Sequence, residues 1–490
     1  MTAVVRTERG QISGIGTDVV AYLGVPFAAP PIGDLRWKPP QKPAPWSGVR
    51  QCTAFGDDPL QGMRGEGRGS TYSEDCLTLN IWTLGSDKSG GDKRPVMVWF
   101  YGGGFMVGSA SYPMYDGEAL ARKGVVVVTI NYRLGIFGFM AHPALTAESP
   151  NHASGNYGFL DQVAALKWVR ENIAEFGGDP GNVTIFGESA GACSVASHLV
   201  SPLSRGLFQK AILESPATLR KLYTLDAAEK AAVAMVGNDI VALRAMPAEE
   251  LLPKGAQIGA GPGRLTAPQP IRMITDGWAF PEDERAALLA GRFAHVPMIV
   301  GGNEDEGSFF VRNMPVKNLA DYDGFTAMGF GPFAEEARRL YPAKSDAEVF
   351  AAVSDFFADS LFNSGVRGLA RLNAKAGAPT FRYLFTRRRN GKPMPPSHVE
   401  EVPYVFGNLD VPFFGQNLGA SDGDRAVSAA MMGAWARFAA TGDPNGSGLA
   451  WPAYDSARDN YLVFGDPFGA GAGWRTKYMD FFEHVFAATD

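Results

Sequence analysis

The sequence predicts an α/β fold with a central, mostly parallel sheet, flanking helices and helical cap insertions. Short β-branched runs are separated by helical patterns, as where the Asp161–Glu175 stretch precedes the strand at Val183, and this alternation is typical of βαβ units. The chain has 490 residues, of which 46% are hydrophobic and 20% charged. These values are typical of a globular protein with a large core.

Strand-like runs alternate with turns in the first third of the chain, and helical patterns in the middle indicate insertions on a sheet-centred core. Strand-like runs are Val19–Leu23, Leu77–Trp82, Val96–Phe100, the run from Val125, the strand at Val183 and Val296–Val300. Helical patterns cover Ala227–Leu252, Phe333–Leu340, Ser345–Leu372 and Arg425–Ala440. The glycine-rich stretches Gln61–Ser70, Gly255–Gly263 and Gly415–Gly423 indicate loops. We therefore expect one domain over residues 1–490, with a core of about 1–215 and 270–490 and a helical insertion of about 220–265 and 315–375.

Composition argues against several classes of partner and environment. The net charge of −6 does not favour nucleic acid or an anionic membrane as a partner. Charges interrupt the first residues before an apolar stretch can form, and no apolar run reaches membrane-spanning length. The three cysteines, Cys52, Cys76 and Cys193, argue against a disulfide framework, although the sequence leaves a Cys52–Cys76 bond open. A cytoplasmic location is the expectation.

The most informative segment is Gly187-Glu188-Ser189-Ala190-Gly191. It lies between the β-branched run Asn182–Ile185 and a helical stretch, Ala192–Leu199. A Gly-x-Ser-x-Gly segment between a strand and a helix predicts a nucleophile elbow of the α/β-hydrolase fold, in which the turn presents the serine hydroxyl to a site. An ordinary tight turn is the alternative.

A serine nucleophile requires oxyanion donors, a base and an acid that orients the base. Tyr101-Gly102-Gly103-Gly104-Phe105 directly follows the Val96–Phe100 strand. The backbone N–H groups of Gly103, Gly104 and Ala190 are the expected oxyanion donors. A flexible turn at the strand end is the alternative for these glycines.

The order serine, acid, histidine along the chain favours His398 as the base, because it lies late and in a loop. The other histidines are His142 and His152 before Ser189, His198 on the same helix as Ser189, His295 before a strand, and His484 near the C-terminus. His198 is expected to be a packed helix residue. The acid is expected after the Val296–Val300 strand, where Glu304, Asp305 and Glu306 remain alternatives.

Over nearly its whole length the chain resembles the type-B carboxylesterases of the carboxylesterase/cholinesterase family, in their bacterial form. The matching motifs are Gly24–Ala28, Pro31–Arg36, Ser73–Asn80, Asn131–Gly135, Phe176–Pro180, Gly187–Gly191, Asn303–Gly307, His398 with Glu401–Tyr404, and Thr441–Asn445. The resemblance implies that Glu306 is the acid. It also implies buried ion pairs of Arg36 with Glu74 and of Arg133 with Asp161, and a hydrogen bond from Ser215 near the acid and base.

The chain also departs from this family. The cysteine that would pair with Cys76 aligns near Pro59, so the family's loop disulfide is expected to be absent, and the cysteines of the second bridge are missing. The tryptophan that stacks on choline in cholinesterases is not found before Ser73, which argues against a quaternary ammonium substrate. Phe105, Met106, Phe309 and Phe310 are the expected pocket residues, with plain core packing as their alternative.

The predicted activity is hydrolysis of small to medium apolar carboxylic esters through an acyl-enzyme on Ser189, with His398 and Glu306. Carbamate or amide hydrolysis by the same residues is an alternative, and a non-catalytic binding protein is a further one. The expected partner is a small-molecule ester, with no cofactor, metal, nucleic acid or membrane. The expected assembly is a monomer or small homo-oligomer.

Overall fold

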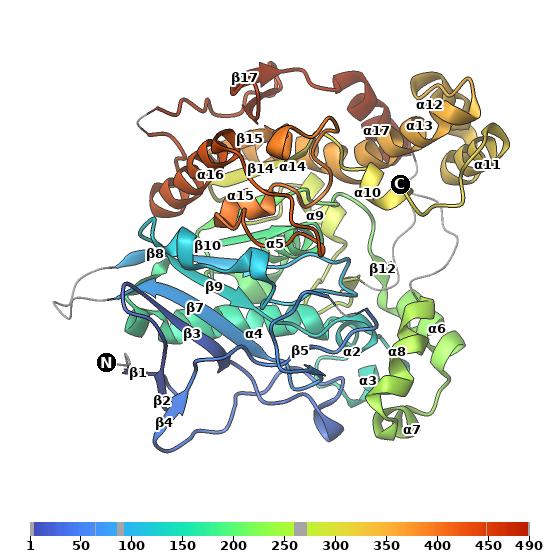
Figure 1. Cartoon of the computed structure of the whole chain (residues 1–490). Helices are drawn as coiled ribbons and strands as arrows, with labels where there is room; N and C mark the ends of the chain where they lie inside the picture. The colour runs from blue at the N-terminus through green and yellow to red at the C-terminus, as the bar shows by residue number, and fades with distance from the viewer. Residues whose placement is uncertain (1–3, 64, 86–92, 259–271, 447, 489–490) are drawn as a thin grey trace.

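A ten-stranded sheet crosses the molecule, with helices on both of its faces (Figure 1). The computed structural model describes residues 4–63, 65–85, 93–258, 272–446 and 448–488. Across the sheet the strands are β17 (Gly469–Ala472), β16 (Asn460–Phe464), β15 (Thr380–Phe385), β14 (Met298–Asn303), β11 (Lys210–Glu214), β10 (Gly178–Glu188), β8 (Arg94–Phe100), β9 (Val126–Ile130), β7 (Thr78–Leu84) and β3 (Val19–Pro26).

The middle of this sheet is parallel. Neighbours from β16 across to β9 pair in parallel, whereas β7 pairs antiparallel with both β9 and β3, and β17 pairs antiparallel with β16. Every residue of β9, β11 and β14 is buried, which explains the apolar stretches Val126–Val128, Ala211–Leu213 and Met298–Val300 within them. The prediction of an α/β-hydrolase fold with a mostly parallel sheet is confirmed.

In the described part of the chain, three small sheets lie outside the main one. Their strands are β1 (Val4–Arg6), β2 (Gln11–Ser13) and β4 (Val49–Gln51); β5 (Asp58–Pro59) and β6 (Tyr72–Ser73); and β12 (Tyr223–Thr224) and β13 (Ile274–Thr275). The last pair joins the two ends of the segment that contains α6, α7 and α8.

The structure has helices in every stretch where the sequence predicts them, and further helices that no predicted pattern covers, such as Leu319–Phe330 and Thr476–Ala488. They are α1 (Glu118–Ala121), α2 (Gly135–Phe139), α3 (Pro143–Glu148), α4 (Tyr157–Asn172), α5 (Ala190–Val200), α6 (Leu225–Val236), α7 (Ile240–Ala245), α8 (Ala248–Ile258), α9 (Glu284–Leu289), α10 (Ser308–Val311), α11 (Leu319–Phe330), α12 (Ala334–Leu340), α13 (Asp346–Ala358), α14 (Ser364–Lys375), α15 (Val402–Phe406), α16 (Asp422–Thr441) and α17 (Thr476–Ala488). Short 3₁₀ turns are η1 (Gly33–Leu35), η2 (Pro113–Tyr115), η3 (Ile173–Phe176), η4 (Pro202–Ser204), η5 (Gly331–Phe333) and η7 (Arg389–Gly391).

Two predicted helices are interrupted. The Ala227–Leu252 pattern forms three helices, because Gly237 has a φ of +84° that ends α6 and Pro247 directly precedes α8. The Ser345–Leu372 pattern is divided by a π-helical turn, η6 (Asp359–Asn363). The predicted loop at Gly255–Gly263 begins inside α8, and its remainder lies outside the described residues.

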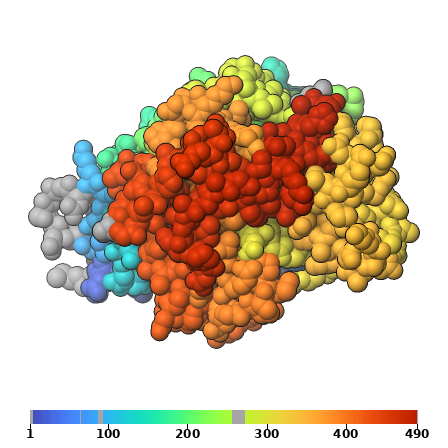
Figure 2. All heavy atoms as spheres, turned by 90° about the horizontal axis from the view of Figure 1, so that it is seen from above, coloured from blue at the N-terminus to red at the C-terminus, as the bar shows by residue number. Residues whose placement is uncertain are grey.

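Two groups of helices lie beside the sheet, α6 to α8 and α11 to α13, both on the right in Figure 1. The second group has its own buried cluster, in which Phe325, Phe330 and Phe356 pack with Phe481 and Phe482 of α17. Seen from above, the last third of the chain, yellow to red, covers most of the molecule (Figure 2). The division into one domain with a core and helical insertions stays a prediction.

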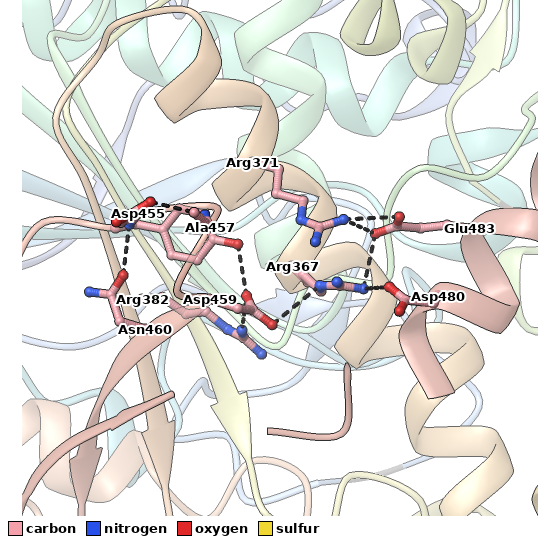
Figure 3. A network of polar contacts seen from close by, with 10 residues as sticks. Arg367, Arg371, Arg382, Asp455, Ala457, Asp459, Asn460, Asp480 and Glu483 are labelled. Carbon is pink, nitrogen blue, oxygen red and sulfur yellow. Dashed lines mark hydrogen bonds and ion pairs between the residues drawn. The ribbon is translucent and has the colours of Figure 1, made fainter. Parts of the chain in front are cut away.

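The C-terminal helix is held to the body by an ion network (Figure 3). Arg367 of α14 binds Asp480 of α17 at 2.6 Å, and Arg371 binds Glu483 at 3.0 Å. Arg367 also lies 3.3 Å from Asp459, which accepts a 2.7 Å hydrogen bond from Arg382 of β15. The network therefore ties α17 to α14 and to the sheet.

The two ion pairs implied by the resemblance are present. Arg36 binds Glu74 through Nε at 2.8 Å and Nη2 at 2.5 Å, and Arg133 binds Asp161 through Nε at 2.8 Å and Nη2 at 2.7 Å. All three cysteines are free and buried, so Cys52 and Cys76 are not bonded to each other. Within the described ranges, no helix combines the length and apolar character needed to cross a bilayer.

Replacing Asp161 with asparagine should destabilise the fold strongly. The Arg133 and Asp161 side chains are 3% and 0% exposed, so the variant leaves a buried guanidinium without its counter-ion, at a cost of about 3 kcal/mol or more. Urea unfolding measures this change. In the matched control Glu118→Gln, which breaks an exposed pair with Arg122, the loss should stay below about 1 kcal/mol. Equal losses in the two variants would contradict the prediction.

Candidate active site

The turn between β10 and α5 holds Ser189 in a strained conformation. Its φ is +54° and its ψ is −120°, a region that side-chain-bearing residues rarely occupy without a functional reason. The Ser189 N–H donates to the Glu214 carbonyl of β11 at 2.9 Å. A Cβ atom at Gly191 would lie 1.9 Å from the Phe100 carbonyl oxygen, and one at Gly187 would lie 2.6 Å from the same oxygen. Both glycines are therefore required by close backbone packing.

His398 and Glu306 meet beside this turn. His398 Nδ1 lies 2.5 Å from Glu306 Oε2, and both side chains are buried. Glu306 follows the end of β14, whereas His398 lies in the loop between β15 and α15. Two donors hold the other carboxylate oxygen: the Ser215 hydroxyl at 2.5 Å, which the resemblance implied, and the Asn303 N–H at 2.6 Å.

The structure distinguishes the three adjacent carboxylates. Glu304 binds Arg388 at 2.9 Å, and Asp305 accepts hydrogen bonds from the Ser308 N–H and the Ser354 hydroxyl. Only Glu306 of the three contacts a histidine among the described residues. His198, expected to be a packed residue, is buried against Phe100 and Phe159.

The second ring nitrogen of His398 faces Glu188, the residue before Ser189. His398 Nε2 lies 3.0 Å from Glu188 Oε1, without hydrogen-bond geometry. No hydrogen bond joins His398 to the Ser189 hydroxyl within the described part of the chain; such bonds are often long before substrate binds. The ring of Phe362 packs over the imidazole, with centroids 4.6 Å apart.

Behind His398 lies a group of buried carboxyls that sequence reasoning missed. Burial, and then repulsion from neighbouring carboxylates, raises the pKa of Glu188 and of Glu401 well above the ordinary value. Burial raises the pKa of Glu214 to about 8. The sequence holds a signal for each, because Glu188 lies inside the serine motif, Glu214 precedes Ser215, and Glu401 follows His398 closely.

The three expected oxyanion donors border one cavity together with Ser189 and His398. Gly103 and Gly104 have φ values of +103° and +62°, and their N–H groups donate to no acceptor among the described residues. Ala190 is the first residue of α5, so its N–H has no partner within the helix. Three backbone donors are thus free to bind an anionic oxygen.

The cavity has a volume of about 510 Å³ and is mainly apolar. Phe105, Phe309 and Phe310 line it, as expected, whereas Met106 is not among the lining residues and packs against the main hydrophobic core. Sequence reasoning missed further lining residues: Met63, Tyr112, Met114, Tyr115, Phe357, Leu361, Phe362 and Phe414. No group of three metal-ligating side chains occurs among the described residues.

The parallel sheet, the strained serine at its strand-to-helix turn and the buried histidine–carboxylate pair define an α/β-hydrolase. The chain belongs to the carboxylesterase family, whose family model matches residues 1–482, and it is an enzyme that hydrolyses carboxylic esters.

Several relatives support this assignment. The chain is similar to a fumonisin B1 esterase of Sphingopyxis macrogoltabida, with 47% identity over 92% of this chain and 84% of the relative. It is similar to the para-nitrobenzyl esterase of Bacillus subtilis (strain 168), with 36% identity over 94% of each chain. A solved PNB esterase structure matches with a TM-score of 0.85 and 32% identity, covering 98% of this chain and 100% of that one. The resemblance to bacterial carboxylesterases is confirmed.

The buried carboxyl of Glu214 should make stability depend on pH. Its pKa is about 8 in the folded protein and about 4.5 when unfolded. Between these values the unfolded chain has released a proton that the folded chain keeps. The free energy of unfolding therefore falls as pH rises, by up to about 1.4 kcal/mol per pH unit.

Glu214→Gln should flatten this slope without abolishing it, because the raised pKa values of Glu188 and Glu401 act in the same direction. Urea unfolding at pH 5.5 and 7.5 measures the slope for each protein. The control Glu335→Gln, at an exposed pair with Arg339, should keep the wild-type slope. A Glu214→Gln slope equal to that of the wild type would refute the prediction.

Proposed function

We propose that this enzyme cleaves esters with Ser189 as nucleophile, His398 as general base and Glu306 as the carboxylate that orients the histidine. The observation that carries the proposal is the 2.5 Å contact between Glu306 and His398 Nδ1, beside the strained Ser189 turn. Since Nδ1 faces the carboxylate, Nε2 is the nitrogen left to exchange a proton with the serine.

The reaction has two steps. His398 takes the Ser189 proton as the hydroxyl attacks the ester carbonyl, and the N–H groups of Gly103, Gly104 and Ala190 stabilise the oxyanion. His398 then protonates the leaving alcohol and activates the water that releases the acid. Glu306 stabilises the imidazolium. The raised pKa of Glu188 favours its neutral form, so it competes little with Glu306 as a counter-ion.

The cavity supports small to medium esters as substrates. Its volume of about 510 Å³ and its apolar, aromatic walls suit an ester with short or medium chains. No tryptophan lines it among the described residues, which supports the exclusion of choline esters. The names of the relatives, para-nitrobenzyl esterase and fumonisin B1 esterase, refer to esters rather than carbamates or amides. A cytoplasmic location and a monomeric or small homo-oligomeric state stay predictions.

Ser189→Ala should lower kcat on p-nitrophenyl esters by at least about 10⁴-fold, because no other group takes over as nucleophile. The measurement is the initial rate of wild type and variant on p-nitrophenyl esters of increasing acyl length, together with thermal unfolding of both proteins. The Tm of Ser189→Ala should stay close to that of the wild type.

Ser194→Ala is the matched control, because Ser194 lies on the same helix but contacts Gln162. This variant should keep most of the activity. Retention of most activity by Ser189→Ala would overturn the assignment, and a faster Ser189-dependent rate on matched amides or carbamates would favour the alternative substrates.

A further inference from the structure

Two buried arginines lie close together, and one of them borders the cavity. Arg220 and Arg272 are 7% and 6% exposed, and Arg272 lines the cavity wall. Arg220 Nη1 is enclosed and has no hydrogen-bond partner, and no described residue forms an ion pair with its guanidinium. A buried guanidinium ordinarily has a carboxylate or several acceptors around it. Arg220 therefore has unused capacity to bind an anion.

Arg272 is only partly satisfied. Its Nη1 donates to the Ala217 carbonyl at 3.0 Å, whereas Nε and Nη2 are enclosed without hydrogen bonds. The neighbouring carboxylate, Glu284, lies 3.8 Å from Nη2. That carboxylate already accepts from the Ser197 hydroxyl at 2.5 Å and the Thr218 hydroxyl at 3.0 Å. Arg272 thus has one distant carboxylate partner, which other donors already hold.

The charges at this place do not balance. Burial, and then repulsion from Arg272, lowers the pKa of Arg220 to about 10, so Arg220 remains protonated at neutral pH. Among the described residues Glu284 pairs with Arg272 and no carboxylate pairs with Arg220, so the two arginines carry an excess positive charge. A planar guanidinium binds a carboxylate through two parallel hydrogen bonds. One additional carboxylate would satisfy the free N–H groups and the charge together.

Arg272 and Ser189 border the same cavity and are linked by a few contacts. The Ala217 carbonyl that binds Arg272 also accepts from Cys193 Sγ at 3.4 Å. Cys193 is one helical turn after Ser189 on α5, and both Cys193 and Ala217 line the cavity. A turn of helix rises about 5.4 Å, so this short series of contacts places Arg272 near Ser189 on the wall of one cavity.

We propose that Arg220 and Arg272 bind a free carboxylate of the substrate, so that the preferred substrates are esters with a carboxylate a few carbons from the ester carbonyl. This inference rests on the proposed cleavage at Ser189 and narrows the expectation of purely apolar esters. Glu66, which also lines the cavity, comes from a separate segment and accepts the Gly415 N–H through Oε1. Among the described lining residues Arg272 is the only arginine or lysine, so the wall that attracts an anion is the one beside it.

Matched pairs of alkyl esters test whether a carboxylate on the substrate improves cleavage, and on which side of the ester bond it must lie. Monoethyl glutarate against ethyl pentanoate places the carboxylate on the acyl side, and 4-(butanoyloxy)butanoate against butyl butanoate places it on the alcohol side. Acid release in a pH-stat gives kcat/KM for all four. In at least one pair the charged ester should be favoured by about tenfold or more, mainly through KM.

Variants show whether the arginines cause this preference. Arg220→Met and Arg272→Met should reduce the charged-to-neutral ratio of kcat/KM to near one, and Arg220→Lys should restore part of it. Arg220→Met should not lower Tm, because it removes an uncompensated buried charge, whereas a purely structural arginine would lower it. Arg122→Met, at an exposed pair with Glu118, should leave the ratio unchanged. An unchanged ratio in Arg220→Met and Arg272→Met would overturn the proposal.

Binding to Ser189→Ala separates this inference from the proposed function. Glutarate should bind the variant at least about tenfold more tightly than pentanoate by calorimetry, and Arg220→Met in the same background should remove the difference. Ser189-dependent cleavage of neutral esters with no preference in either pair would overturn the carboxylate site alone. Absence of Ser189-dependent cleavage of all four esters, with glutarate still preferred, would overturn the proposed function and leave the carboxylate site standing.

Discussion

The close approach of the α5 N-terminus to the end of β8 is the constraint on which the site depends. β10 pairs in parallel with β8 so that Gly187 lies opposite Phe100, and Gly191 packs directly on the Phe100 carbonyl. The segment after Phe100 is the glycine loop of Gly103 and Gly104. The backbone contact that admits only glycine therefore places the strained serine beside the free N–H groups, and a single side-chain carbon there would separate the two.

The remaining groups are brought in by the next strands of the same sheet. Parallel strands place their carboxyl ends at one edge, so Glu306 after β14 and His398 after β15 reach the turn after β10. Ser215 directly follows β11, the strand between β10 and β14, and its hydroxyl fixes the orientation of Glu306. The pairing order of the strands, rather than proximity in the sequence, assembles the constellation. The burial that results also raises the pKa values of Glu188, Glu214 and Glu401.

Sequence reasoning reached the sheet and the position of Ser189, because β-branched runs and the glycine pattern are local signals. It could not choose among Glu304, Asp305 and Glu306 from composition, since the choice depends on which side chain turns inward; only the family resemblance indicated Glu306. The broken helix between Ala227 and Leu252 was missed because apolar spacing continues across Gly237. Arg220 and Arg272 were missed because their meeting is a long-range contact across an insertion, without a motif.

The wide separation of Ser189 and His398 in the sequence also has a consequence for the synthesis of the protein. The ribosome adds roughly 200 residues between Ser189 and His398, which takes on the order of ten seconds or more. The network of Arg367, Asp459 and Asp480, which fastens α17, forms later still. A nascent or truncated chain therefore displays its serine turn without the histidine. With His398 as the proposed general base, ester hydrolysis begins only after most of the chain has been made.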